Sequence, residues 1–226
     1  MSRELSLITG LRLMQLADSA FPAGGFTQSF GLETFVQRGD IKTGQDLTGF
    51  MQTYLYYTWR PTDLLALKLA WLAAGQEDRL RLSELDRRLN AMKVPAESRE
   101  GSVKMGRQLR RLLVAIDAGY VSGMDLPFGH QAIILGHYGA AAKIDLSLLL
   151  AAYGHMTAAA LVANGVRAVP LGQTAGQQVL AVLQPLLAAC IQWVSTAQEH
   201  DWGGSAPAID WAGMAHEGLY SRIFMS

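Results

Sequence analysis

One long segment of this chain carries almost no charge. Between positions 146 and 198 the only charged residue is Arg167. A helix that is apolar on every side is normally buried. We therefore expect two successive helices here, either wrapped by other helices or forming a large apolar surface that meets another protein. The most apolar part, 179–194, includes Pro185 and falls short of the roughly 18 apolar residues that a membrane span needs, so a core helix is favoured and no membrane is expected.

The rest of the chain has the periodicity of amphipathic helices. Apolar residues recur every three or four positions, as in Leu82, Leu85, Leu89 and Met92. Strand signals are scarce, because no long alternating run occurs and no Asn-Gly or Asp-Gly pair joins two such runs as a hairpin turn. The segment 60–63 contains Pro61 and is expected to separate two helices. The sequence thus predicts an all-α, single-domain bundle over 1–226. It should have about ten helices, with central apolar helices wrapped by amphipathic ones, and 199–226 as a carboxyl-terminal tail.

Composition narrows the class of protein. Half of the 226 residues are apolar and only 17% are charged, against about 25% in typical soluble proteins. The formal net charge is zero, so binding to nucleic acid is not expected, whereas association with other protein chains is. The single cysteine, Cys190, excludes a disulfide framework. The first residues, 1–4, lack a basic region followed by an apolar stretch, so we expect a cytoplasmic protein.

Local motifs for catalysis or tight metal binding are missing. The glycine-containing stretch 172–177 has no lysine and is not a phosphate loop. We interpret it as a helix start at which Gln173 or Thr174 satisfies free backbone N–H groups. None of the five histidines forms a His-x-x-x-His pair. Two alternatives stay open: an enzyme built on a helical bundle with acids such as Glu33, and a freestanding metal-binding protein that uses His130, His137 and Cys190.

Three segments together carry a recognisable signature. The first is Leu16–Glu33, LADSAFPAGGFTQSFGLE, which has a Pro-x-Gly-x-Phe turn followed by a Ser-x-Gly-Leu-Glu helix start. The second is Val169–Gln177, VPLGQTAGQ, and the third is Met214–Ser226, MAHEGLYSRIFMS. A weaker fourth segment is Glu97-Ser98-Arg99 followed by Met105-Gly106. In order, spacing and placement these segments resemble the UreF family of urease accessory proteins. The departures are small: Met225 stands where many relatives have a basic residue, and Ile223 replaces leucine.

The resemblance implies an all-α homodimer without catalytic activity of its own. It implies a complex with a UreD/UreH-type scaffold protein and with UreG, a nickel-binding GTPase whose activity it would modulate. That complex delivers nickel to apo-urease, so no cofactor is bound tightly by this chain and nickel is handled by the complex.

The resemblance also implies the site residues. The expected partner-binding residues belong to the tail and are His216, Glu217, Tyr220, Arg222, Ile223, Phe224 and Ser226. A further candidate surface joins the other two segments and comprises Pro22, Gly24, Phe26, Ser29, Glu33, Gly172, Gln173, Thr174 and Gln177. By its residues alone, the apolar end of the chain either folds back on the core or docks into a partner, and the resemblance favours docking. The core pattern ends before the tail, so we expect the core to fold without it.

Overall fold

The chain is a bundle of helices. The computed structural model describes residues 3–121 and 124–226, and these residues contain ten α-helices and no β-strand. The helices are α1 (Arg3–Ala17), α2 (Leu32–Arg38), α3 (Gly44–Thr53), α4 (Leu65–Gly75), α5 (Arg79–Met92), α6 (Ala96–Asp117), α7 (Gln131–Ala141), α8 (Leu146–Ala168), α9 (Gln173–Thr196) and α10 (Pro207–His216). The all-α prediction is confirmed. The expectation of a cytoplasmic protein was based on residues 1–4, of which Met1 and Ser2 lie outside the described residues.

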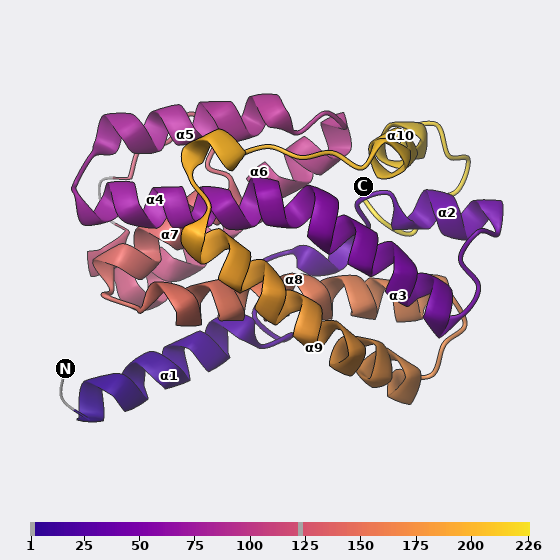
Figure 1. Cartoon of the computed structure of the whole chain (residues 1–226), viewed down its shortest axis with the longest axis horizontal. Coiled ribbons are helices and arrows are strands. Elements are labelled where there is room, and N and C mark those ends of the chain that lie inside the picture. Colours follow the sequence, from indigo (N-terminus) through magenta and orange to yellow (C-terminus); the bar gives the residue numbers. More distant parts are fainter. Residues whose placement is uncertain (1–2, 122–123) are drawn as a thin grey trace.

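The uncharged stretch forms α8 and α9, which pack against each other on the lower side of the bundle in Figure 1. α8 also contacts α1, α3, α4 and α7. It buries one side, with Leu149, Tyr153 and Leu161, while Leu148 is exposed. α9 buries one stripe of side chains, Val179, Leu183, Leu187, Cys190 and Val194, and leaves apolar residues such as Val182 exposed on the other side. Both helices are long and apolar enough to cross a bilayer, a property that core helices of soluble proteins share. The apolar stretch therefore supplies two helices that each pack one side against the bundle and leave apolar residues exposed on the other.

The expected break at Pro61 is wrong. α3 continues into a π-helical stretch, Tyr54–Leu64, which continues directly into α4. Proline lacks a backbone N–H and its ring clashes with the preceding turn of an α-helix, and the wider π-helical turn relieves this conflict. Residues from far along the chain bind to it: Gly203 N–H donates to the Pro61 carbonyl (2.9 Å) and the Trp202 indole N–H donates to the Thr62 carbonyl (3.0 Å). The segment that begins the predicted tail is thereby fixed to the middle of the bundle.

The close approach of α4 and α7 depends on a glycine. A Cβ atom added to Gly136 on α7 would lie 2.5 Å from the Leu67 carbonyl oxygen and 2.8 Å from the Ala70 Cβ on α4. Such distances are below van der Waals contact, and backbone atoms cannot move aside as a flexible side chain can. The two helices therefore pack backbone against backbone at this point.

Gly136→Ala is expected to lower the free energy of unfolding by about 1–3 kcal/mol, because the added methyl group pushes α4 and α7 apart. Gly49→Ala is the matched control. Nothing lies within 4 Å of the added Cβ atom in the interior of α3, so this change should raise stability by about 0.5–1 kcal/mol. Urea unfolding followed by circular dichroism measures both, and equal stability of the two variants would contradict the proposed close packing.

Candidate functional site

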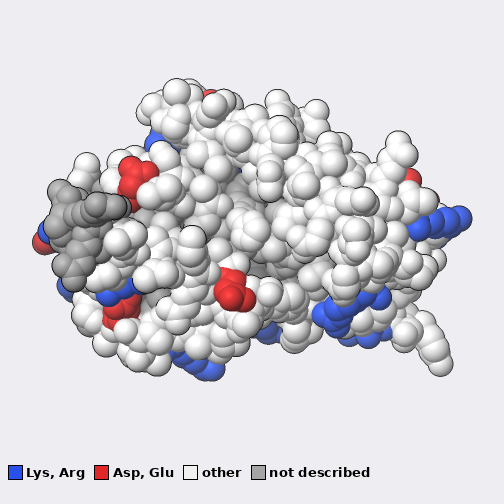
Figure 2. Space-filling view, turned by 90° about the horizontal axis from the view of Figure 1, so that it is seen from below, with Lys and Arg blue, Asp and Glu red and all other residues white. Residues whose placement is uncertain are grey.

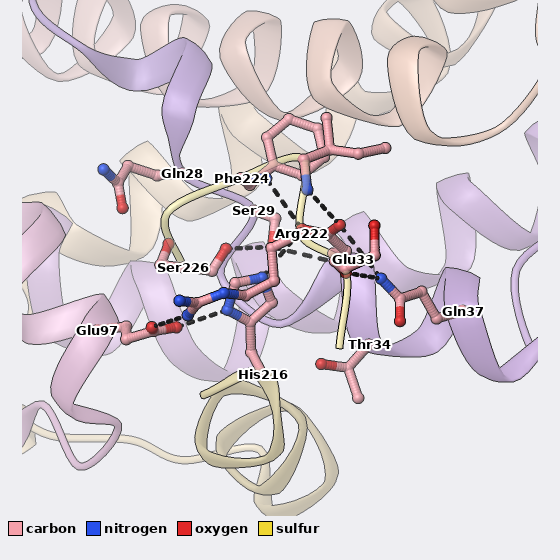
Figure 3. Close-up of polar contacts among 12 residues, drawn as sticks. Gln28, Ser29, Glu33, Thr34, Gln37, Glu97, His216, Arg222, Phe224 and Ser226 are labelled. Carbon is pink, nitrogen blue, oxygen red and sulfur yellow. Dashed lines mark hydrogen bonds and ion pairs between the residues drawn. The ribbon is translucent and has the colours of Figure 1, made fainter. Parts of the chain in front are cut away.

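The two ends of the signature meet in space, as Figure 3 shows for the tail and the loop before α2. Met225 N–H donates to the Thr27 carbonyl and Ser29 N–H donates to the Ser226 carbonyl, each at 2.8 Å. The Ser29 hydroxyl also donates to the Ser226 carbonyl. Met225 and Ser226 are therefore held alongside the first segment by main-chain hydrogen bonds.

Glu33 is the centre of this contact. Its side chain is almost fully buried in the first turn of α2, where the helix dipole favours a negative charge. One carboxylate oxygen accepts from Ile223 N–H (2.7 Å) and the other from Phe224 N–H (3.0 Å). A buried carboxylate needs such donors, because an unpaired buried charge is strongly unfavourable. Glu33 thus binds the backbone of the tail directly.

His216, at the end of α10, joins Glu33 to a second acid. Its Nε2 lies 3.0 Å from a Glu33 oxygen and its Nδ1 lies 2.5 Å from a Glu97 oxygen on α6. The ring is fully buried. Each ring nitrogen therefore lies within hydrogen-bonding distance of a different carboxylate. Arg222 completes the group by donating to the other Glu97 oxygen at 2.6 Å. We call Glu33, Glu97, His216 and Arg222 the tail network.

The surroundings of Glu33 favour its charged form. Burial alone would raise the pKa of Glu33, but the hydrogen bonds from His216, Ile223 and Phe224 lower it below the ordinary value of 4.5. The carboxylate is therefore stabilised by the tail, and by the same linkage the tail is stabilised by the carboxylate.

The tail turns some of its side chains inward and others outward. Phe224 and Ser226 are buried, and the Arg167 guanidinium lies 5.0 Å from the centre of the Phe224 ring. Tyr220 is fully exposed, and Ile223 and Met225 are each more than half exposed. We call Tyr220, Ile223 and Met225 the outer ridge. The tail thus folds back on the core in the isolated chain and still presents large apolar groups to solvent.

The first segment of the signature is fixed to α8. The Asn164 amide donates to the carbonyls of Gly25 (3.1 Å) and Gln28 (2.7 Å), and Arg167 donates to the Phe26 carbonyl (2.8 Å). Gly24 adopts a positive φ of 91°, which a residue with a side chain rarely tolerates. The loop is therefore a fixed structure against which the tail can pair.

The remaining predicted site residues lie elsewhere or on the surface. Gly172, Gln173, Thr174 and Gln177 are exposed at the start of α9, and Pro22 and Glu217 are exposed as well. Among the described residues, no hydrogen bond joins the α9 group to the tail network. The expected helix cap is also wrong: α9 begins at Gln173, with Gly172 preceding it, and no side chain caps it.

The candidate metal ligands do not come together. Within the described part of the chain, no group of three His, Cys, Asp or Glu side chains is placed to hold a metal ion. His130 is buried against Ser102 and Asn90, and burial lowers its pKa to about 4. Cys190 is buried on α9, where burial raises the pKa of its thiol to about 11. Both side chains are therefore part of the buried core.

Comparison with known proteins agrees with the signature. Residues 41–184 match the UreF family. The chain belongs to the UreF family. It is 34% identical over 226 aligned positions to a urease accessory protein UreF of Bacillus sp. (strain TB-90), covering 96% of this chain and 98% of the relative. It is 36% identical over 222 positions to the UreF of Actinobacillus pleuropneumoniae serotype 5b (strain L20), covering 95% and 97%. The resemblance inferred from the three segments is therefore confirmed.

Three residues that hold the tail of this UreF-family chain were absent from the predicted site. Glu97 lies in the weaker fourth segment, which was the only signal for it. Gln37 donates to the Ser221 carbonyl at 2.6 Å. Arg167 stands out in the sequence only as the one charge in the uncharged stretch. Nothing in the spacing of these residues indicates that they meet the tail.

Acidification is expected to loosen the tail before the bundle unfolds. In the folded chain the pKa of Glu33 lies below its ordinary value of 4.5. The Glu33 carboxylate therefore stabilises the fold fully at pH values above 4.5. This stabilisation is lost as the pH falls through the lowered pKa. Glu33→Gln imitates the protonated acid and should lower the exchange protection of the Ile223 and Phe224 amides at neutral pH by about ten- to a hundredfold.

Hydrogen exchange of those two amides measures both effects. Glu217→Gln is the control, because it removes an equal charge from the exposed residue next to His216. Unchanged protection in Glu33→Gln, or an equal loss in Glu217→Gln, would show that the Glu33 carboxylate does not hold the tail.

Proposed function

We propose that this chain is a non-enzymatic adaptor in urease maturation. In this proposal it acts in the cytoplasm and joins a UreD/UreH-type scaffold protein to a UreG-type GTPase, so that nickel reaches apo-urease. The family membership and the names of the relatives, urease accessory proteins, support the role in maturation. Nickel and GTP are bound by the partners, and this chain supplies binding surfaces.

The outer ridge is the observation that supports an adaptor most directly. Free chain ends lose order unless something holds them, and here a buried network fixes the tail while three large apolar side chains remain exposed. Aromatic and arginine side chains contribute much of the energy of protein interfaces. A rigid ridge with Tyr220 at one end, beside the half-exposed Arg222, is therefore suited to bind the scaffold protein.

The solvent exposure of the Arg222–Glu97 ion pair limits its contribution to the stability of the fold. The Arg222 and Glu97 side chains are 41% and 19% exposed, and ion pairs that water reaches contribute only about 0.2–1 kcal/mol to stability. A larger effect of Arg222→Ala on binding, about 2–5 kcal/mol, requires that the partner exclude water from the pair. In this proposal Arg222 contributes little to folding and more to binding of the scaffold protein.

Tyr220→Ala combined with Ile223→Ala is expected to weaken binding to the scaffold protein by at least about tenfold without changing the melting temperature, because both side chains are exposed. Calorimetric titration and thermal melting measure the two quantities. Tyr57→Ala is the control, since Tyr57 is 55% exposed on a different part of the surface. Deletion of 220–226 is less decisive, because it also removes the buried Phe224 and Ser226. Scaffold binding that survives the double substitution unchanged would exclude the outer ridge.

We further propose that two copies of the chain associate through the face formed by α1, α8 and α9. Figure 2 views the molecule from below, from the side where these helices lie in Figure 1, and charged side chains are sparse over much of this face. α1 exposes Leu7, Leu11 and Met14, each more than 60% exposed and spaced as one helical stripe. Large exposed apolar surfaces of this kind mark protein interfaces.

Leu11→Asp combined with Met14→Asp is expected to turn the dimer into a monomer, because two charges would be buried without partners. Sedimentation velocity at tens of micromolar, about the range in which an interface of standard size is occupied, measures the change. Leu80→Asp is the control, because Leu80 is 86% exposed on α5. A wild-type chain that sediments as a monomer would exclude the dimer.

A further inference from the structure

A groove lined by three arginines lies beside α6, away from the tail. It has a volume of about 490 Å³, and its lining includes Arg107, Arg110 and Arg111 together with the apolar side chains of Leu126 and Phe128. The three arginines are exposed, whereas Leu126 and Phe128 are half-buried. The groove therefore combines positive charge along one wall with an apolar surface along the other.

The charge of these arginines is not neutralised within the chain. Among the described residues, none of the three forms an ion pair, and Asp125 is the one acid in the lining of the groove. Some arginines elsewhere are paired with acids: Arg81 and Arg88, for example, share Glu199. In a chain with zero net charge, three adjacent unpaired guanidinium groups make a local positive field that attracts an anionic group.

Buried hydrogen bonds and a close backbone contact hold the loop that carries Phe128, on the apolar wall of the groove. The buried carboxylate of Asp86 accepts from the N–H groups of Phe128 (2.7 Å), Gly129 (2.9 Å) and His130 (3.0 Å). A Cβ atom added to Gly106 on α6 would lie 2.0 Å from the Gly129 carbonyl oxygen, so the helix and this loop touch through their backbones. A surface fixed in this way binds without a large cost of ordering.

The arginine wall is itself partly fixed. The Arg107 Nε–H donates to the Phe128 carbonyl at 3.2 Å, which leaves the terminal amino groups of its guanidinium available. Arginine holds carboxylates through two parallel hydrogen bonds. The neighbouring Arg110 and Arg111 on the same helix present the same group, so the wall offers several carboxylate-binding positions.

We propose that this groove binds an acidic segment of a partner protein, with carboxylates on Arg107, Arg110 and Arg111 and one apolar side chain against Leu126 and Phe128. A nucleic acid fits less well, because it would require a broad basic face and an excess of positive charge over the chain. Free phosphate would use the arginines and leave the apolar wall uncovered. The surface is distinct from the tail network and the outer ridge, so the proposal does not depend on the adaptor role.

A fluorescent peptide of glutamates around a single phenylalanine is the probe, and its binding to the full chain is followed by fluorescence anisotropy at low salt. We expect saturable binding that weakens as salt is added. Arg110→Glu combined with Arg111→Glu should weaken it by at least about tenfold, because like charges then face the peptide. Replacing the peptide phenylalanine by alanine should weaken binding by a smaller factor.

Two controls test whether the peptide binds in the groove and whether the variants stay folded. Arg87→Glu combined with Arg79→Glu changes the net charge equally on α5, outside the groove, and should alter binding less than about twofold. Circular dichroism melts of all variants confirm folding, which is expected to persist because every substituted arginine is exposed or lacks an ion pair among the described residues.

Three results would overturn the proposal. One is an absence of saturable binding, and another is equal weakening in the α5 control, which would mean nonspecific attraction. The third is displacement of the peptide by inorganic phosphate or by a single-stranded oligonucleotide at lower concentration than by unlabelled peptide, which would assign the groove to phosphate groups.

Discussion

The buried carboxylate of Glu33 is the interaction on which the rest of the candidate site depends. It is the only residue of the tail network that bonds both to the tail backbone and to His216. Removing any one donor leaves a buried negative charge less well satisfied, which costs more than the hydrogen bond itself is worth. The order of the tail, the position of the His216 ring and the placement of Glu97 are therefore coupled through one side chain.

The bundle brings these groups together through close backbone contacts. Gly31, with a φ of 88°, precedes α2, and a Cβ atom there would lie 3.1 Å from the backbone of α10. Thr34 then donates to the Ala212 carbonyl at 2.7 Å. α2 and α10 are thus held near enough for Glu33 and His216 to meet, with both side chains buried. The network is a product of helix packing as much as of its own charges.

The sequence was informative about local structure and much less so about contacts. Periodicity indicated the helices, and the uncharged stretch marked α8 and α9, because both signals are carried by neighbouring residues. Glu33 and His216 are 183 positions apart, and nothing in a single sequence shows that two such residues touch. The break expected at Pro61 failed for a different reason. The rule for proline assumes α-helical geometry, and the chain adopts a wider turn there whose carbonyls bind Trp202 and Gly203.

The pairing of residues 27–29 with 225–226 also constrains the order of folding. Closing a loop of nearly the whole chain is entropically costly and follows the formation of local helices. Residues 221–226 follow all ten helices in the sequence, so we expect this contact to be among the last to form. The outer ridge is consequently displayed in its fixed form only by chains that have completed their longest-range contacts, and a protein that recognises it would discriminate finished chains from partly folded ones.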